Sequence, residues 1–350
     1  MADVRADASP SLPSHQRVVR AVERAMASLD VRWQGQNVVV AVSGGADSTF
    51  LLHATCALRR RFGYRIMVAH VNHGWRGAAS HEDANAVARL GESLGTAVHL
   101  LTVVGTRHVK PRGGIEAAAR AVRYEFLAEV ARSCDAVAVL VAHTADDQTE
   151  TIILSLLRGR SVAGLSGMAD AGPLPVANAP RALLARPMLA IGADVVRNTL
   201  RANGITWRTD ESNDDRTRVR NRVRHEVVPA LEKISPGFRT ALARAARDVE
   251  AARDIFDAAI QAAATRWQVD CNGWSVARAD WLTDARQVRL GALREVLLRV
   301  GVPEEMIESG HLRAVDRMVT SNRGGAWRAV GPTTIQLSGG RLTVLTRPEG

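Results

Sequence analysis

The chain has 350 residues, 46% of them hydrophobic, which is enough for a large α/β domain and a smaller second domain. Its longest wholly apolar run, residues 136–142, is far shorter than the roughly 20 residues that a membrane-spanning helix needs, so a membrane protein is excluded. The formal net charge of +10 favours a polyanionic partner such as nucleic acid, although richness in arginine alone leaves that question open.

The beginning of the chain lacks the features of a targeting signal. Two aspartates and two prolines lie within the first 13 residues, and no apolar segment follows a basic start, so we predict a disordered leader over residues 1–14. Cys56, Cys134 and Cys271 stand far apart and form no CxxC pair. This pattern indicates a reducing compartment, and we expect the cytoplasm.

Short apolar runs alternate with longer stretches of helical periodicity from residue 37 to residue 158. This alternation is typical of a parallel sheet with crossover helices. The runs predict buried parallel strands over residues 38–42, 66–71, 98–104 and 136–142. Helices are predicted over residues 48–61, 80–94, 115–133 and 146–157. We therefore predict a nucleotide-binding α/β domain over residues 15–220.

The remainder of the chain predicts another architecture. Residues 159–180 are rich in Gly, Pro, Ala and Ser and predict a loop, after which the α/β pattern resumes over residues 183–202. Residues 222–318 have helical character, and residues 326–345 alternate like a β-hairpin around two glycines. We expect a mainly helical domain over residues 221–325 and a β-hairpin tail over residues 326–350.

Residues 43–48 read Ser-Gly-Gly-Ala-Asp-Ser and join the first predicted strand to a helix. Gly44 and Gly45 allow backbone N–H groups to approach phosphate oxygens, and the start of the helix adds its positive dipole end. The hydroxyl groups of Ser43 and Ser48 supply further donors. Asp47 is suited to binding magnesium or to capping the helix. The simpler alternative is an ordinary βα turn capped by serine.

Polar side chains follow the second and fourth predicted strands. His70, His73 and Arg76 end the second strand, and His143 ends the fourth, so the sheet should bring them to the crevice beside the phosphate loop. Asp147 and Glu150 are three positions apart, so the two carboxylates share a helix face, where they can bind magnesium or hold the ammonium group of an amine. The histidine pair has the spacing of metal ligands but lacks a third ligand, which favours hydrogen bonding over zinc.

These motifs resemble those of a known group of enzymes. The residue 43–48 loop is similar to that of the PP-loop, or N-type ATP pyrophosphatase, superfamily, whose fold is like that of the adenine nucleotide alpha hydrolases. Together with His-Val-Asn-His-Gly-Trp-Arg at 70–76, Asp-Asp-Gln-Thr-Glu-Thr at 146–151 and Arg-Asn-Arg-Val-Arg-His at 220–225, it resembles the tRNA(Ile)-lysidine synthetase family over about residues 37–235. Trp75 and Thr144 depart from the family pattern, which usually has leucine at the first position and often histidine at the second.

The resemblance implies an ATP-dependent carbon–nitrogen ligase that uses Mg²⁺. The wobble cytidine of an isoleucine tRNA with a CAU anticodon attacks the α-phosphorus of ATP, and free lysine then displaces AMP from carbon-2. No obligate protein partner is evident from the sequence. The implied ATP-binding residues are Ser43, Gly44, Gly45, Ala46, Asp47 and Ser48; the implied catalytic residues are Asp47, Asp147, Glu150 and Arg222, with magnesium at Asp47 and Asp147; and the implied substrate contacts are His70, His73, Arg76, His143, Arg220 and Arg224.

Other functions stay open at this stage. A PP-loop tRNA thiolase would adenylate a base in the same way, but it depends on reactive cysteines, and none here lies in a suitable loop motif. An amide-forming synthetase would normally carry an ammonia-supplying domain, and a nucleotide sensor would need no amine site. The arginines between residues 216 and 224 form either a solvated helix face or a contact to nucleotide or tRNA. We expect residues 222–346 to bind the body of the tRNA.

Overall fold

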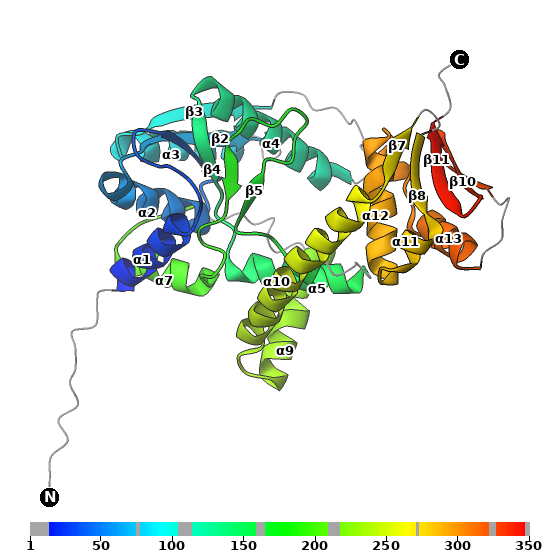
Figure 1. Cartoon of the computed structure of the whole chain (residues 1–350). Helices are drawn as coiled ribbons and strands as arrows, with labels where there is room; N and C mark the ends of the chain where they lie inside the picture. Colours follow the sequence, from blue (N-terminus) through cyan, green and yellow to red (C-terminus); the bar gives the residue numbers. More distant parts are fainter. Residues whose placement is uncertain are drawn as a thin grey trace, which may run out of the picture. The chain divides into compact units, whose positions relative to one another are not determined.

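The computed structural model describes residues 14–74, 78–103, 114–158, 165–208, 218–270, 273–321 and 327–346. The predicted leader lies outside these ranges except for Ser14. The chain divides into two compact units, Met1–Arg247 and Asp248–Gly350, and each is described by itself (Figure 1). None of the helices in the described ranges combines the length and the apolar composition that crossing a membrane requires.

The first unit contains a six-stranded sheet in the order β3-β2-β1-β4-β6-β5, parallel except for β5. Its strands are β1 (Asn37–Ala41), β2 (Arg65–Asn72), β3 (Ala97–Thr102), β4 (Ala136–Leu140), β5 (Ala171–Pro173) and β6 (Leu183–Ala185). The four predicted strands and the parallel sheet are confirmed, but the predicted burial is wrong for β3, an edge strand whose residues are half-buried or exposed. Strand β5 falls within the predicted loop 159–180. Its three residues include Gly172 and Pro173, which are poor strand formers, and such a segment is tolerated at the edge of a sheet.

Helices cover both faces of this sheet: α1 (Ser14–Ala27), α2 (Ala46–Phe62), α3 (Ala78–Ser93), α4 (Gly114–Ser133), α5 (Ala145–Leu157) and α7 (Ala193–Ala202). Alternation along β1 separates the two cores: Val38 and Val40 pack with α1, α2 and α7, whereas Val39 packs with α4. Burial on both faces explains why the strands lack polar alternation.

The first unit extends beyond the predicted boundary at residue 220. Helix α8 (Val219–Arg222), a π-helical turn (Val223–Val227) and α9 (Val228–Ile234) follow one another without a break. Ile153 of α5 packs against Val223 and Val228, so these helices share a core with the sheet domain. The boundary falls between Arg247 and Asp248 instead, inside helix α10 (Phe238–Thr265).

The second unit combines helices with a five-stranded antiparallel sheet in the order β7-β8-β11-β10-β9. The elements are β7 (Gln268–Asp270), β8 (Gly273–Ala277), α11 (Arg278–Leu282), α12 (Arg286–Arg299), a 3₁₀ turn (Glu304–Met306), α13 (Ser309–Thr320), β9 (Trp327–Val330), β10 (Thr333–Ser338) and β11 (Arg341–Thr346). The predicted hairpin is confirmed as β10 and β11. The helical prediction for residues 222–318 is wrong for β7 and β8, which are too short to show their own periodicity.

The hairpin is not a separate tail. Ile335 of β10 and Val344 of β11 are fully buried in one core with Leu293 of α12 and Val315 of α13. A two-stranded hairpin is marginal on its own and gains stability from a packed helix face or further strands. The predicted division at residue 325 therefore has no counterpart in the structure.

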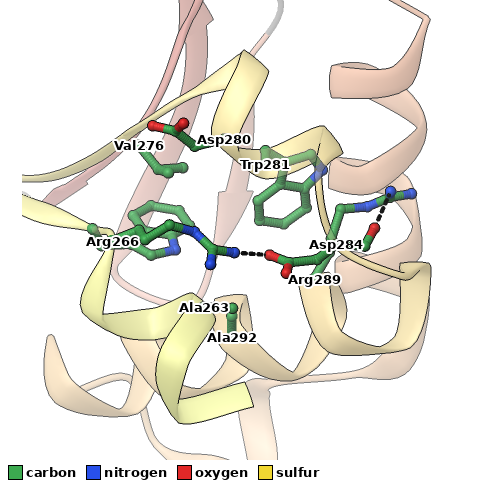
Figure 2. A pocket seen from close by; sticks show the side chains of 9 residues that line it. Ala263, Arg266, Val276, Asp280, Trp281, Asp284, Arg289 and Ala292 are labelled. Atoms are coloured by element: carbon green, nitrogen blue, oxygen red, sulfur yellow. Dashed lines mark hydrogen bonds and ion pairs between the residues drawn. The ribbon is translucent and has the colours of Figure 1, made fainter. Parts of the chain in front are cut away.

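A buried carboxylate ties the helices of the second unit together. Asp316 of α13 accepts hydrogen bonds from Arg289 Nε at 2.8 Å and Trp281 Nε1 at 3.3 Å, and it pairs with Arg286 at 3.2 Å. Arg289 also donates to the Asp284 carbonyl at 2.9 Å, and the Asp284 side chain pairs with Arg266 (Figure 2). The network satisfies groups that would otherwise be costly to bury.

Asp316→Ala should destabilise the second unit by about 3–5 kcal/mol, because it leaves the buried Arg289 without its anionic partner. Chemical unfolding followed by tryptophan fluorescence measures this loss. Glu304→Gln is the control, since its ion pair with Arg294 is exposed and should contribute less than about 1 kcal/mol. Equal effects of the two substitutions would contradict the structural role of Asp316.

Candidate active site

The phosphate loop lies between β1 and the first turn of α2. Gly44 has φ of +91°, a left-handed conformation that strains other residues, and Gly45 is the helix N-cap. Ser48 Oγ accepts a hydrogen bond from the Ser43 N–H at 3.1 Å and donates to the Gly45 carbonyl at 3.1 Å. The first-turn N–H groups of α2 have no acceptor within the helix. The loop therefore presents a preformed set of donors to an anion.

Asp47 lies in the first turn of α2, and its Oδ1 is buried without a hydrogen-bond partner among the described residues. Burial raises the pKa of Asp47 to about 6, assisted by Asp147 and Asp146 and opposed by Arg197 and Arg224. An unsatisfied, partly buried carboxylate oxygen fits a bound cation. Mg²⁺ typically takes one or two protein carboxylates and completes its shell with phosphate oxygens and water, which this position allows.

No cluster of three or more potential metal-ligating side chains occurs within the ranges that the structure describes. A magnesium ion at Asp47 would therefore depend on oxygens from a phosphate ligand. Asp147, the second predicted metal ligand, has both carboxylate oxygens in hydrogen bonds: Oδ2 accepts from the Thr144 N–H at 2.9 Å, and Oδ1 from Arg220 at 3.0 Å. Asp47 is thus the more available of the two ligands.

Asp146 and Asp147 hold the helix starts around the site. Asp147 caps its own helix through the Thr144 N–H and hydroxyl group. Asp146 instead accepts a hydrogen bond from the Ala193 N–H at 2.7 Å, at the start of α7, and pairs with Arg239 at 3.0 Å. Asp146 therefore caps a neighbouring helix, and it links α5 with α7 and α10.

Glu150 is buried, with 1% of its surface exposed, and two arginines neutralise it. Arg220 Nε donates to Oε2 at 2.7 Å, and Arg224 Nε donates to Oε1 at 2.5 Å. Arg220 also bridges to Asp147. We call Asp147, Glu150, Arg220 and Arg224 the acid–arginine cluster. Such charge-assisted bonds are among the stronger hydrogen bonds in proteins, and breaking one here would leave a buried charge.

Arg222, which the sequence interpretation favoured over its neighbours, lies outside this cluster. Its side chain is 61% exposed and pairs with Glu226 at 3.5 Å. Residues two apart on a helix point about 200° away from each other, whereas residues four apart share a face. Arg220 and Arg224 therefore face the carboxylates together, and Arg222 does not join them. The spacing of the three arginines already contained this signal.

The histidines predicted to line the crevice are held largely uncharged. Burial is the main cause that lowers the pKa of His70, of His73 and of His143, the last to about 4. His70 Nδ1 lies 2.7 Å from the Val42 carbonyl, just before the phosphate loop. These rings suit neutral hydrogen bonding rather than anion binding. Their contact with substrate stays a prediction, and Arg76 lies outside the described residues.

The chain is similar in sequence to members of one enzyme family. A family model described as a PP-loop domain matches residues 15–231. The tRNA(Ile)-lysidine synthase of Thermobifida fusca is 36% identical over 307 residues, which cover 87% of this chain and 89% of that protein. The one from Streptomyces coelicolor is 34% identical over 309 residues, covering 88% and 84%. The chain belongs to the tRNA(Ile)-lysidine synthase family. The predicted family and the PP-loop fold are confirmed.

Other family members are longer. The chain matches 60% of the length of the Geobacter sulfurreducens tRNA(Ile)-lysidine synthase and 57% of the Treponema pallidum one, each at 35% identity and over 82% and 76% of this chain. Among solved structures, a U34-tRNA thiolase from Methanococcus maripaludis with its [4Fe-4S] cluster is similar, with a TM-score of 0.55 and 16% identity over 68% of this chain and 79% of that one. At this identity the likeness concerns the fold alone.

Two further arginines lie near the phosphate loop of this lysidine synthase family member and were not predicted from sequence. Arg197 of α7 is the cation that most lowers the pKa of Asp47. The Arg208 N–H donates to the Gly44 carbonyl at 2.9 Å. Both arginines are more than 140 residues away from the loop in sequence and come close to it only in the folded chain, so no local motif indicates them. The arrangement thus combines anion donors, one free carboxylate oxygen and a cluster of paired charges.

Asp47→Asn should stabilise the nucleotide-free protein at pH 7.5 by on the order of 1–2 kcal/mol. The pKa of Asp47 is raised from 3.8 to about 6 in the fold, so the folded state binds more protons than the unfolded state between these values. Wild-type stability should therefore fall as pH rises through that window, with the full penalty present above about pH 6. Urea unfolding of both proteins from pH 4 to pH 7.5, without magnesium, measures the difference.

The stability gain of Asp47→Asn should shrink toward zero as pH approaches 4, and the same variant should lose binding of ATP with magnesium. Asp248→Asn removes a carboxylate from an exposed position and controls for net charge. A variant less stable than wild type at pH 7.5 would show that Asp47 is satisfied in the free protein.

Proposed function

We propose that the protein ligates lysine to carbon-2 of the wobble cytidine in an isoleucine tRNA with a CAU anticodon. ATP, lysine and tRNA would yield AMP, pyrophosphate and lysidine-containing tRNA. Membership of the tRNA(Ile)-lysidine synthase family supports this assignment. The observation that supports it is that the phosphate loop lies near the acid–arginine cluster: Asp147 raises the pKa of Asp47 and Arg224 lowers it, as charges close to this carboxylate would.

The first proposed step forms an adenylate. The cytidine O2 attacks the α-phosphorus of ATP, the bond from that phosphorus to the bridging oxygen breaks, and pyrophosphate leaves. The phosphate loop would hold the polyphosphate through its N–H groups and the hydroxyl groups of Ser43 and Ser48. Arg220 and Arg224 lie close enough to Asp147 and Glu150 to supply positive charge at the same edge of the sheet.

Magnesium is proposed as the counterion of this step. The free Asp47 oxygen would hold it, and the bound ion would supply charge that offsets the negative charge growing on the leaving pyrophosphate. Asp147 would join only by giving up a hydrogen bond to Arg220 or Thr144.

The second proposed step transfers the base to lysine. The side-chain amine attacks carbon-2, the bond from carbon-2 to the activated oxygen breaks, AMP leaves, and the nitrogen loses a proton. The sequence interpretation gives Asp147 and Glu150 the lysine ammonium group. Both oxygens of Glu150 already accept hydrogen bonds from arginine. Lysine can therefore reach this pair only by exchanging with a guanidinium group, and Arg220, with a side chain 42% exposed, is the more accessible one.

Sulfur transfer is disfavoured by the environment of the described cysteines. Burial raises the pKa of the Cys56 and Cys134 thiols, which reduces the thiolate population that such chemistry needs. Cys134 follows α4 and Cys56 lies in α2, and Cys271 is outside the described residues. A cytoplasmic location, the absence of an obligate protein partner and tRNA binding by residues 222–346 stay predictions.

The direct test is incorporation of radiolabelled lysine into a transcript of isoleucine tRNA with CAU, in the presence of ATP and magnesium. A methionine tRNA with the same anticodon is the control substrate. Label should enter the isoleucine tRNA alone, and Asp47→Ala should reduce the rate by at least about 100-fold, because it removes a group aimed at the reacting phosphates. Pyrophosphate release without lysine incorporation would keep adenylation and reject lysine as the nucleophile.

Arg220→Ala should lower the KM for lysine while reducing the rate of adenylation about 10- to 100-fold, since it frees the carboxylates but removes positive charge from the site. Steady-state kinetics with varied lysine, and pyrophosphate release with tRNA, measure the two effects. Arg222→Ala is the matched control, two residues away but outside the acid–arginine cluster, and should change neither parameter more than about twofold. A raised lysine KM for Arg220→Ala would show that arginine and lysine do not compete.

A further inference from the structure

The segment after α7 returns to the phosphate loop from more than 160 residues along the chain. Arg208 donates its backbone N–H to the Gly44 carbonyl at 2.9 Å. The Thr49 hydroxyl group reaches the same carbonyl at 3.4 Å, a weaker contact. Gly44 is buried, and a side chain there would meet Val87 of α3 and the stem of Arg208. Arg208 thus fixes the carbonyl of Gly44, the first of the two glycines in the loop.

This hydrogen bond fixes a peptide plane. In a trans peptide the C=O and the following N–H point in opposite directions. The Gly44 carbonyl points to Arg208, so the Gly45 N–H points to the other side, where Ser43 Oγ lies at 3.4 Å. A glycine at φ of +91° has little intrinsic preference for one orientation, because it lacks a side chain. An external hydrogen bond is therefore needed to select the orientation that presents the donor to an anion.

The side chain of Arg208 anchors this contact to α3. Its Nε donates to Asp83 Oδ1 at 2.7 Å, and its Nη2 donates to Glu82 Oε2 at 3.2 Å. The Asp83 side chain is only 10% exposed, whereas that of Arg208 is 46% exposed. The preceding residue, Trp207, packs against the main core beside α7. Two contacts therefore hold the backbone of Arg208 in place: its own side chain is anchored to α3, and the preceding residue is packed in the core.

We propose that Arg208 is a positioning residue for ATP, acting through its backbone N–H on the Gly44–Gly45 peptide. The inference rests on the proposed function only in taking ATP phosphate as the ligand of the loop. The side chain serves as an anchor for the backbone and does not itself contact phosphate. Two kinds of variant separate these actions: Arg208→Pro removes the N–H, and Arg208→Ala keeps the N–H but removes the anchor.

The test is binding of MgATP by isothermal titration, without tRNA or lysine, so that no ligation occurs. Arg208→Pro should weaken binding at least tenfold, and Arg208→Ala about threefold, with Asp83→Asn matching Arg208→Ala. In turnover with tRNA, Arg208→Ala should raise the KM for ATP and leave the KM for lysine unchanged, because only the phosphate loop is affected. Arg61→Ala, which removes an exposed ion pair with Glu23 at the far end of α2, should bind MgATP like wild type.

Thermal unfolding shows whether each variant is folded. A folded Arg208→Pro that binds MgATP within twofold of wild type would overturn the proposal. Arg208→Ala as weak as Arg208→Pro would also overturn it, by assigning the effect to the side chain. Should Arg208→Pro fail to fold, the Glu82→Gln/Asp83→Asn double variant decides: threefold weaker binding supports the anchor, and unchanged binding rejects it. Wild-type protein that binds MgATP but ligates no lysine would reject the proposed function and leave this inference standing.

Discussion

The constraint on which the site depends is the buried charge of Glu150. A carboxylate with 1% of its surface exposed must be neutralised, because an isolated charge in the interior costs many kcal/mol. Arg220 and Arg224 provide that neutralisation from a helix 70 residues further along the chain. The same contacts dock α8 and the π-helical turn on α5, where Ile153 packs against Val223. The same ion pairs thus stabilise the fold and place two arginines beside the carboxylates of the candidate site.

The remaining charges follow from this pairing. Asp147 shares the arginines of Glu150, and Asp146 is occupied by Arg239 and the start of α7. Asp47 alone among these four carboxylates keeps an oxygen without a partner in the described part of the chain. Negative neighbours and burial make its ionised form unfavourable, so a cation arriving with a phosphate ligand would be bound strongly. Because the other three carboxylates are already paired, Asp47 is the one whose electrostatic energy would change most when a cation binds.

The sequence predicts this site in proportion to how local each contact is. The 43–48 loop is recognisable because strand, glycines and helix start are consecutive, and the Asp147/Glu150 face follows from three-residue spacing. The position of Arg222 outside the acid–arginine cluster follows from helix phase, since residues two apart point to opposite sides of a helix. The Arg208–Asp83 contact spans 125 residues and leaves no local pattern. Strand β8 has a similar cause, since it also pairs with β11, far along the chain, whereas β7 has only three residues and is too short to show a period.

Several buried polar atoms without a hydrogen-bond partner among the described residues lie at the edge of the sheet where the candidate site residues gather, and others, such as Trp33 Nε1 and His311 Nδ1, lie elsewhere. Buried atoms with no hydrogen-bond partner in the described ranges include Asp47 Oδ1, His70 Nε2, Asn72 Nδ2 and His143 Nδ1, at or after the carboxyl ends of β1, β2 and β4. Each such atom typically costs about 1–3 kcal/mol. A donor or acceptor that already had a partner within the protein would have to break that hydrogen bond before it could bind a substrate. A group without a partner does not carry this cost. Ligands that complete these hydrogen bonds recover that free energy on binding, so the same atoms that weaken the free fold would favour the occupied site.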